Sequence, residues 1–92
     1  MAHRKPFDLR QRQEAVRIYR ALRAHRRKVK RLFPPKNAIM HNQLRDYREL
    51  LDTLLEELIK PDTQVDPDVL NEALKKLAAI AVGYMQQYGL EN

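Results

Sequence analysis

The chain has 92 residues, of which 33% are charged, and its formal net charge is +6. This length leaves room for one hydrophobic core, so residues 1–92 are expected to form a single domain. The absence of cysteine, serine and tryptophan excludes disulfides, iron–sulfur clusters, thiolate zinc sites and catalysis by a serine or cysteine nucleophile.

The first predicted element is a long helix over about residues 8–32. Its apolar positions alternate at spacings of four and three, and Asp8 and Gln11 stand in the relation of a capping box. Pro34 and Pro35 end it. The predicted apolar seam comprises Ala15, Ile18, Leu22, His25, Val29 and Leu32, with Tyr19 at its edge. A lone histidine in such a seam is expected to be a packed, hydrogen-bonded residue, not a ligand or catalyst.

The side opposite this seam carries six cations at helical spacing, which we call the arginine ridge. A ridge from residue 10 to residue 31 spans roughly 30 Å of helix. Its members are Arg10, Arg17, Arg20, Arg27, Lys28 and Arg31. Arg12, Arg23, Arg26 and Lys30 flank the ridge and are better placed to reach neighbouring helices.

The second predicted helix covers about residues 38–60, with Asn37 as its N-cap and Pro61 as its stop. Its apolar stripe is Met40, Leu44, Tyr47, Leu51, Leu54 and Leu58. Its outer face is predicted to carry five acids, namely Asp46, Glu49, Asp52, Glu56 and Glu57.

The third predicted helix covers about residues 67–88, with Asp66 as the cap, Pro67 in the first turn and Gly89 as a left-handed stop. Short connections between three helices favour antiparallel neighbours. The sequence therefore predicts an all-α fold: an antiparallel, up-down-up three-helix bundle with heptad-like seams and a long basic first helix.

The end of the third helix, residues 77–85, is apolar on every side. A helix of this kind is usually buried all round, which favours an interface with a second copy or a partner. The residues predicted for this interface are Ala79, Ile80, Val82, Gly83 and Met85. The alternative is that long arginine stems from the first helix cover the same surface within one chain.

No motif in the sequence indicates a reaction. There is no glycine-rich phosphate loop, and His3, His25 and His41 lack metal-ligand spacing. We therefore expect a non-enzymatic protein without a metal or another cofactor.

The longest apolar run, residues 77–82, is far shorter than the ~20 residues that span a membrane, and the N-terminus lacks a secretory pattern. These features favour a reducing, cytoplasmic location.

The charge distribution is the main functional indication. Residues 1–36 hold 13 Lys and Arg against Asp8 and Glu14, a net +11, whereas residues 37–92 hold 5 against 10 acids, a net −5. The first hypothesis is a nucleic-acid-binding protein whose arginine ridge contacts the phosphate backbone of DNA or RNA. The alternative is an assembly adaptor that docks an acidic protein surface or self-associates through the third helix. Binding to anionic lipid is least favoured, because the apolar face of the first helix is narrow and contains His25.

Overall fold

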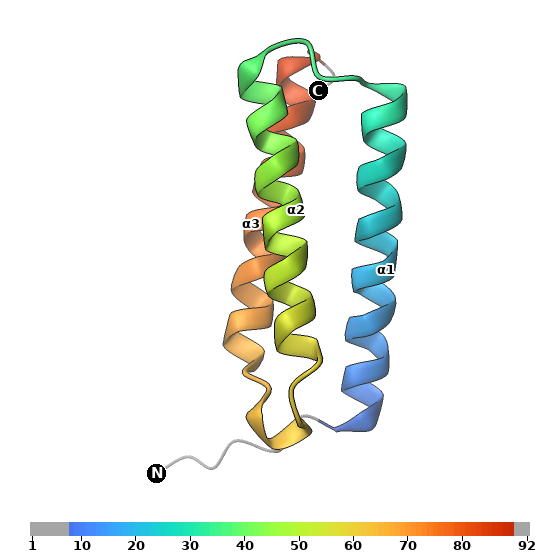
Figure 1. Ribbon diagram of the computed structural model, residues 1–92, viewed down its shortest axis with the longest axis vertical. Coiled ribbons are helices and arrows are strands. Elements are labelled where there is room, and N and C mark those ends of the chain that lie inside the picture. Colours follow the sequence, from blue (N-terminus) through green and yellow to red (C-terminus); the bar gives the residue numbers. More distant parts are fainter. Residues whose placement is uncertain (1–7, 90–92) are drawn as a thin grey trace.

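Three long helices run antiparallel and form an up-down-up bundle (Figure 1). The structure is a computed structural model that describes residues 8–89. Its helices are α1 (Leu9–Leu32), α2 (Ala38–Leu58) and α3 (Pro67–Gln87), and a short 3-10 turn, η1 (Asp62–Gln64), precedes α3. No strand occurs within the described range. The predicted three-helix fold is confirmed.

Each long helix begins at the capping residue that the sequence predicts. At α1, the Asp8 carboxylate accepts the Gln11 N–H at 2.8 Å, and the Gln11 side chain accepts the Asp8 N–H at 3.0 Å. Such a reciprocal capping box satisfies backbone donors that have no partner within the helix. Asn37 and Asp66 cap the two later helices without such a box, and their side-chain oxygens accept the N–H groups of Met40 and Asp68 at 2.9 Å.

The C-terminal end of α3 is also set locally. Gly89 follows the helix with a φ of 69°, in the left-handed region that glycine adopts at low cost. A side chain at this position would meet no other atom within 4 Å, so the requirement for glycine is conformational.

α2 ends at Leu58, two residues before the predicted end at Lys60, and the Glu57 side chain in its last turn points inward. This side chain was predicted on the outer face, but it is only 5% exposed. Its carboxylate accepts the Asp66 N–H at 2.7 Å and the Lys60 ammonium at 2.8 Å. Glu57 thereby joins the last turn of α2 to the start of α3.

The core lies mainly along α2, which packs closely against both α1 and α3, whereas α1 and α3 approach each other less closely. Leu51, Leu54 and Leu58 of α2 meet Leu70 and Leu77 of α3 in one cluster. A second, smaller cluster of Met40, Leu44 and Tyr84 fills the other end of the bundle. The two outer helices therefore depend on α2 for most of their contacts.

The buried side of α1 differs from the predicted seam. It is rotated by about 50° at 100° per residue, so that Tyr19 becomes its most buried residue at 9% exposed. Ile18 and Leu32 remain 41% and 54% exposed, and His25 is exposed without a hydrogen bond to any described residue. The prediction of a packed, hydrogen-bonded His25 is therefore wrong.

The physical reason for this rotation lies in the long side chains next to the seam. The Arg26 guanidinium reaches α2 and donates its Nε–H to the Leu44 carbonyl oxygen at 3.0 Å. Tyr19 buries a large aromatic surface against α2, which outweighs the smaller gain from the edge residues Ile18 and Leu32. The heptad pattern alone does not include either effect.

Candidate polyanion-binding surface

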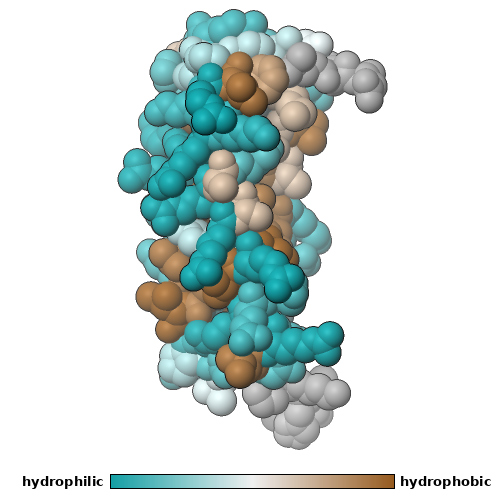
Figure 2. Space-filling model, turned by 90° about the vertical axis from the view of Figure 1, so that its right-hand side faces the viewer, coloured by the Kyte–Doolittle hydropathy of each residue, from teal (hydrophilic) through white to brown (hydrophobic). Residues whose placement is uncertain are grey.

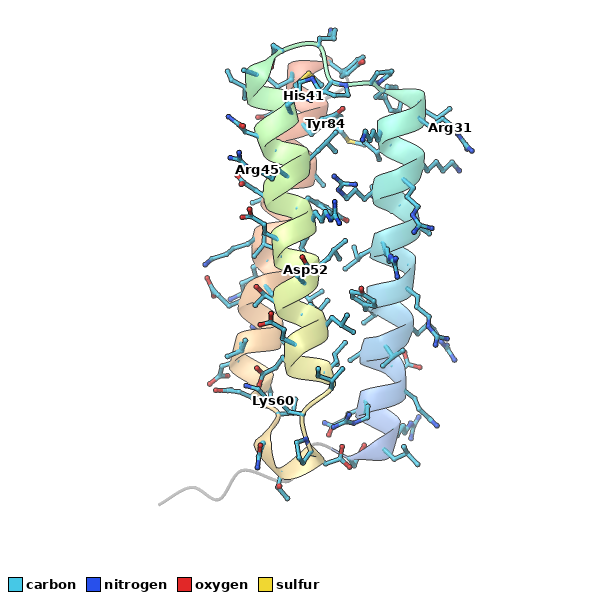
Figure 3. All side chains as sticks on the ribbon, viewed as in Figure 1. Arg31, His41, Arg45, Asp52, Lys60 and Tyr84 are labelled. Atoms are coloured by element: carbon cyan, nitrogen blue, oxygen red, sulfur yellow. The ribbon has the colours of Figure 1, made fainter. Side chains whose placement is uncertain are left out.

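The arginine ridge lies on the outer side of α1, and all six of its residues are exposed. Figure 2 views the molecule from the α1 side and shows hydrophilic side chains along this whole face, with apolar groups visible between them. Arg31 points away from α2 and α3 (Figure 3). α1 as a whole contains ten Lys and Arg residues and one acid, Glu14, a net charge of +9.

The ridge charge is almost entirely unpaired. Arg17 lies 3.5 Å from Glu14, but both side chains are largely exposed, which screens the interaction. The other ridge cations form no ion pair with a described carboxylate. A pairing of the ridge with the acids of α2 therefore does not account for its charge.

Three acids of the other elements form ion pairs with residues outside the ridge. Asp46 contacts Arg45 at 3.9 Å within α2, and Glu57 binds Lys60. Asp62 of η1 is the carboxylate that pairs with α1 across the bundle, and its partner is Arg12, which lies outside the ridge.

Two arginines of α1 are structural. Arg12 donates to Asp62 Oδ1 at 2.7 Å, to the Leu58 carbonyl oxygen at 2.6 Å and to the Lys60 carbonyl oxygen. It thus binds carbonyl groups at the end of α2, which have no partner within that helix. The predicted reach of Arg12 and Arg26 toward neighbouring helices is confirmed. Arg23 and Lys30 form no such bond to a described residue.

A second group of arginines surrounds a hollow between α1 and α2, which we call the arginine hollow. It has a volume of about 430 Å³ and is lined by Arg23, Arg26 and Arg27 of α1, by Arg48 and Asp52 of α2, and by Tyr19, Leu51 and Leu55. Arg27 belongs to both the ridge and the hollow. The two surfaces are therefore continuous.

Burial is the largest influence on the pKa of Arg26 in the hollow, and like charge adds to it. Burial lowers the pKa of Arg26, and the positive charge of Arg48 lowers it further. Burial also raises the pKa of Tyr47, although the nearby Arg26 opposes that shift. Opposite charges normally flank a helix–helix seam. Arg48 instead faces the arginines of α1, and sequence analysis missed this indication of an anion site.

An apolar groove lies between α1 and α3. It has a volume of about 380 Å³, and its apolar lining residues include Ala15 and Ile18 of α1, Leu54 of α2, and Leu70 and Leu74 of α3. A separate, smaller pocket is lined by Val29, Tyr84 and Met85 together with His25. The groove exists because both outer helices pack on α2 more closely than on each other.

The structure separates the five residues predicted for an interface on α3. Val82 and Met85 are 55% and 44% exposed, and Ala79 is exposed as well. Ile80 packs against the core instead. Gly83 is half-buried and faces α2, where an added Cβ would lie 3.1 Å from Gln43 Nε2. The accessible part of the predicted interface is therefore Ala79, Val82 and Met85.

The aromatic residues at the end of α3 hold the connection after α1. Tyr84, which Figure 3 labels, donates its hydroxyl to the Phe33 carbonyl oxygen, and Tyr88 donates to that of Pro34. The rings of Phe33 and Tyr88 meet edge to face at 5.4 Å, and the Lys36 ammonium lies 4.2 Å from the Tyr88 ring centre. Both hydroxyls are thus bound to backbone carbonyls.

Within residues 8–89, no group of three or more histidine or acidic side chains is arranged to hold a metal ion. His3 lies outside the described residues. None of the described helices has the length and apolar character needed to cross a membrane.

No family model matches the chain, and no curated protein or solved structure resembles it significantly.

Proposed function

We propose that this protein is a non-enzymatic module that binds the phosphate backbone of nucleic acid through the arginine ridge of α1. The observation that carries the proposal is the lack of neutralisation along that ridge. Its cations share one exposed face, and the acids of α2 and η1 are not their partners. A row of like charges on one helix repels itself, and a bound polyanion relieves that repulsion.

The chemistry of the ridge suits phosphate. Five of its six members are arginine, whose planar guanidinium donates two parallel hydrogen bonds to phosphate oxygens. α1 presents them on a capped helix whose ends are fixed by local bonds, so the row is held in a defined geometry before binding. Backbone contacts of this kind bind without reading base sequence.

The test is fluorescence anisotropy with random-sequence duplex DNA, single-stranded DNA and structured RNA, each in a salt series from about 50 to 200 mM. Six phosphate contacts on duplex DNA correspond to a log–log slope of about −5, at about −0.9 per phosphate. The double variant Arg17→Glu/Arg20→Glu should bind duplex DNA much more weakly, and the magnitude of its salt slope should be smaller by about 2.

A matched control is Lys75→Glu/Lys76→Glu on α3, where both lysines are exposed and the change in net charge is the same. It should retain most of the wild-type affinity, because those lysines lie on another helix. Equal losses in the two variants would mean that net charge, and not the ridge, governs binding. No binding of any nucleic acid by the wild-type protein at the lowest salt would overturn the proposal.

The alternative function is assembly through the apolar groove and the accessible end of α3. The observation that favours it is the exposure of Ile18, Val82 and Met85 on the sides of the two outer helices. Exposed apolar side chains are a common feature of interaction surfaces when they lie close together. A monomeric mass in light scattering at high micromolar concentration would exclude self-association, and a pull-down would then test docking of an acidic protein.

A further inference from the structure

The arginine hollow concentrates more positive charge than its neighbours balance. Arg23, Arg26, Arg27 and Arg48 surround it, whereas Asp52 is the single carboxylate among its lining residues. None of the four arginines forms an ion pair with a described acid. The hollow therefore holds a local charge of +3 when all five groups are ionised.

Most hydrogen-bond donors of these arginines have no partner among residues 8–89. A guanidinium carries five N–H donors. The Nε–H of Arg26 is bound to the Leu44 carbonyl oxygen, whereas Arg23, Arg27 and Arg48 donate to no other described residue. Donors from two different helices thus surround one space, an arrangement that an oxyanion with several acceptor oxygens can satisfy.

The floor of the hollow strengthens such an interaction. Tyr19 and Leu51 are buried there, at 9% and 4% exposed, and Leu55 adds a further apolar side chain. A charge next to an apolar surface is screened less than one in open water. The volume of about 430 Å³ falls within the ordinary range for ligand pockets, about 300–1,000 Å³.

We propose that the arginine hollow seats one phosphate group of the nucleic acid that the ridge binds. This inference rests on the proposed function. Arg27 connects the two surfaces, so a backbone that follows the ridge passes the edge of the hollow at that residue. The hollow adds a contact from α2, through Arg48, to a surface otherwise formed by α1.

The decisive variant is Arg48→Gln, because Arg48 is exposed, lies on α2 and is not part of the ridge. It should weaken binding of duplex DNA about three- to tenfold and reduce the magnitude of the salt slope by about 0.9, as expected for one lost phosphate contact. Arg45→Gln is the matched control, since it lies on the same helix, removes the same charge and does not line the hollow. Figure 3 shows Arg45 extending from the side of α2 away from α1.

Thermal unfolding provides an independent readout with inorganic phosphate as the probe. At matched ionic strength, replacement of chloride by phosphate should raise the Tm of the wild type and of Arg45→Gln more than that of Arg48→Gln. The general stabilising effect of phosphate acts equally on all three proteins. A difference in the Tm increase therefore measures phosphate binding in the hollow.

The outcomes separate the two proposals. If Arg48→Gln binds DNA like Arg45→Gln and the phosphate effect is equal in both, the hollow is not a phosphate site, although the ridge is unaffected by that result. If the wild type binds no nucleic acid at all, the proposed function fails and this inference fails with it. A shallower salt slope of DNA binding in Arg48→Gln but not in Arg45→Gln, together with a smaller rise of its Tm in phosphate, supports the hollow as a phosphate site.

Discussion

Replacement of Arg12 by alanine should destabilise the fold without reducing the intrinsic capacity of the folded protein for polyanion binding. Arg12 is 24% exposed and donates three hydrogen bonds, to Asp62 and to the carbonyl oxygens of Leu58 and Lys60. These bonds are the ionic and hydrogen-bonded link between α1 and the loop after α2. The Arg12→Ala protein loses all of them at once.

The magnitude follows from the exposure of each partner. The Asp62 side chain is 45% exposed, so solvent screens this ion pair to about 0.5–1 kcal/mol. The two carbonyl bonds from a charged donor contribute about 1 kcal/mol each after a similar discount from about 1.5–3 kcal/mol. The expected loss in the free energy of unfolding is therefore about 2.5–3 kcal/mol, which for a domain of this size lowers the Tm by roughly 10–24 °C.

Urea unfolding followed by circular dichroism at neutral pH measures this loss. Arg20→Ala is the control, because Arg20 is exposed and forms no bond to another described residue, and its stability should stay within about 0.5 kcal/mol of wild type. Arg12→Lys should recover only part of the loss, since an ammonium lacks the planar fork that reaches three acceptors. An Arg12→Ala protein as stable as Arg20→Ala would refute the structural role assigned to Arg12.

Three further predictions concern stability. The hydrogen bond from Lys60, followed by that from the Asp66 N–H, lowers the pKa of Glu57. The ionised Glu57 carboxylate therefore contributes fully to the free energy of unfolding above the ordinary carboxyl pKa. This contribution is lost as the pH falls through the lowered folded-state pKa. Glu57→Gln should therefore cost about 1.5–3 kcal/mol at pH 7, and this cost should shrink below about pH 4 in a urea series; a pH-independent difference would contradict it. Leu77→Ala, at a position 1% exposed, should cost about 2–5 kcal/mol in the same assay, whereas a loss below about 1 kcal/mol would mean that the site is not packed as described. Gly89→Ala should lower stability by about 1 kcal/mol through its φ of 69° alone, and an unchanged Tm would show that the α3 terminus does not require this conformation.

The arginines of α1 divide into two classes that the linear pattern alone does not distinguish. Arg12 and Arg26 are bound to backbone carbonyls of other elements, whereas the ridge residues extend into solvent. Sequence analysis identified the flanking positions as the ones able to reach across, and the structure confirms this for both residues. It did not identify their acceptors, because those carbonyl groups become available only where α2 ends and where α1 crosses it.

The sequence by itself determined the number, order and boundaries of the helices to within two residues. Caps at Asp8, Asn37 and Asp66, together with prolines and Gly89, act within a few residues of each helix end, so their effects are visible in the linear pattern. The exposure of the arginine ridge is also evident there, because the ridge lies more than about 110° around the helix from Leu22 at the centre of the predicted seam.

The tertiary structure alone decided how each helix is rotated and which side chains meet. The contact surface of α1 depends on the large aromatic ring of Tyr19 and on a hydrogen bond from Arg26, and a heptad pattern includes neither effect. The inward turn of Glu57 required the N–H of Asp66 to be placed beside it. The arginine hollow exists because Arg48 faces α1 across the seam, and such a juxtaposition depends on the relative position of two helices that no local signal specifies.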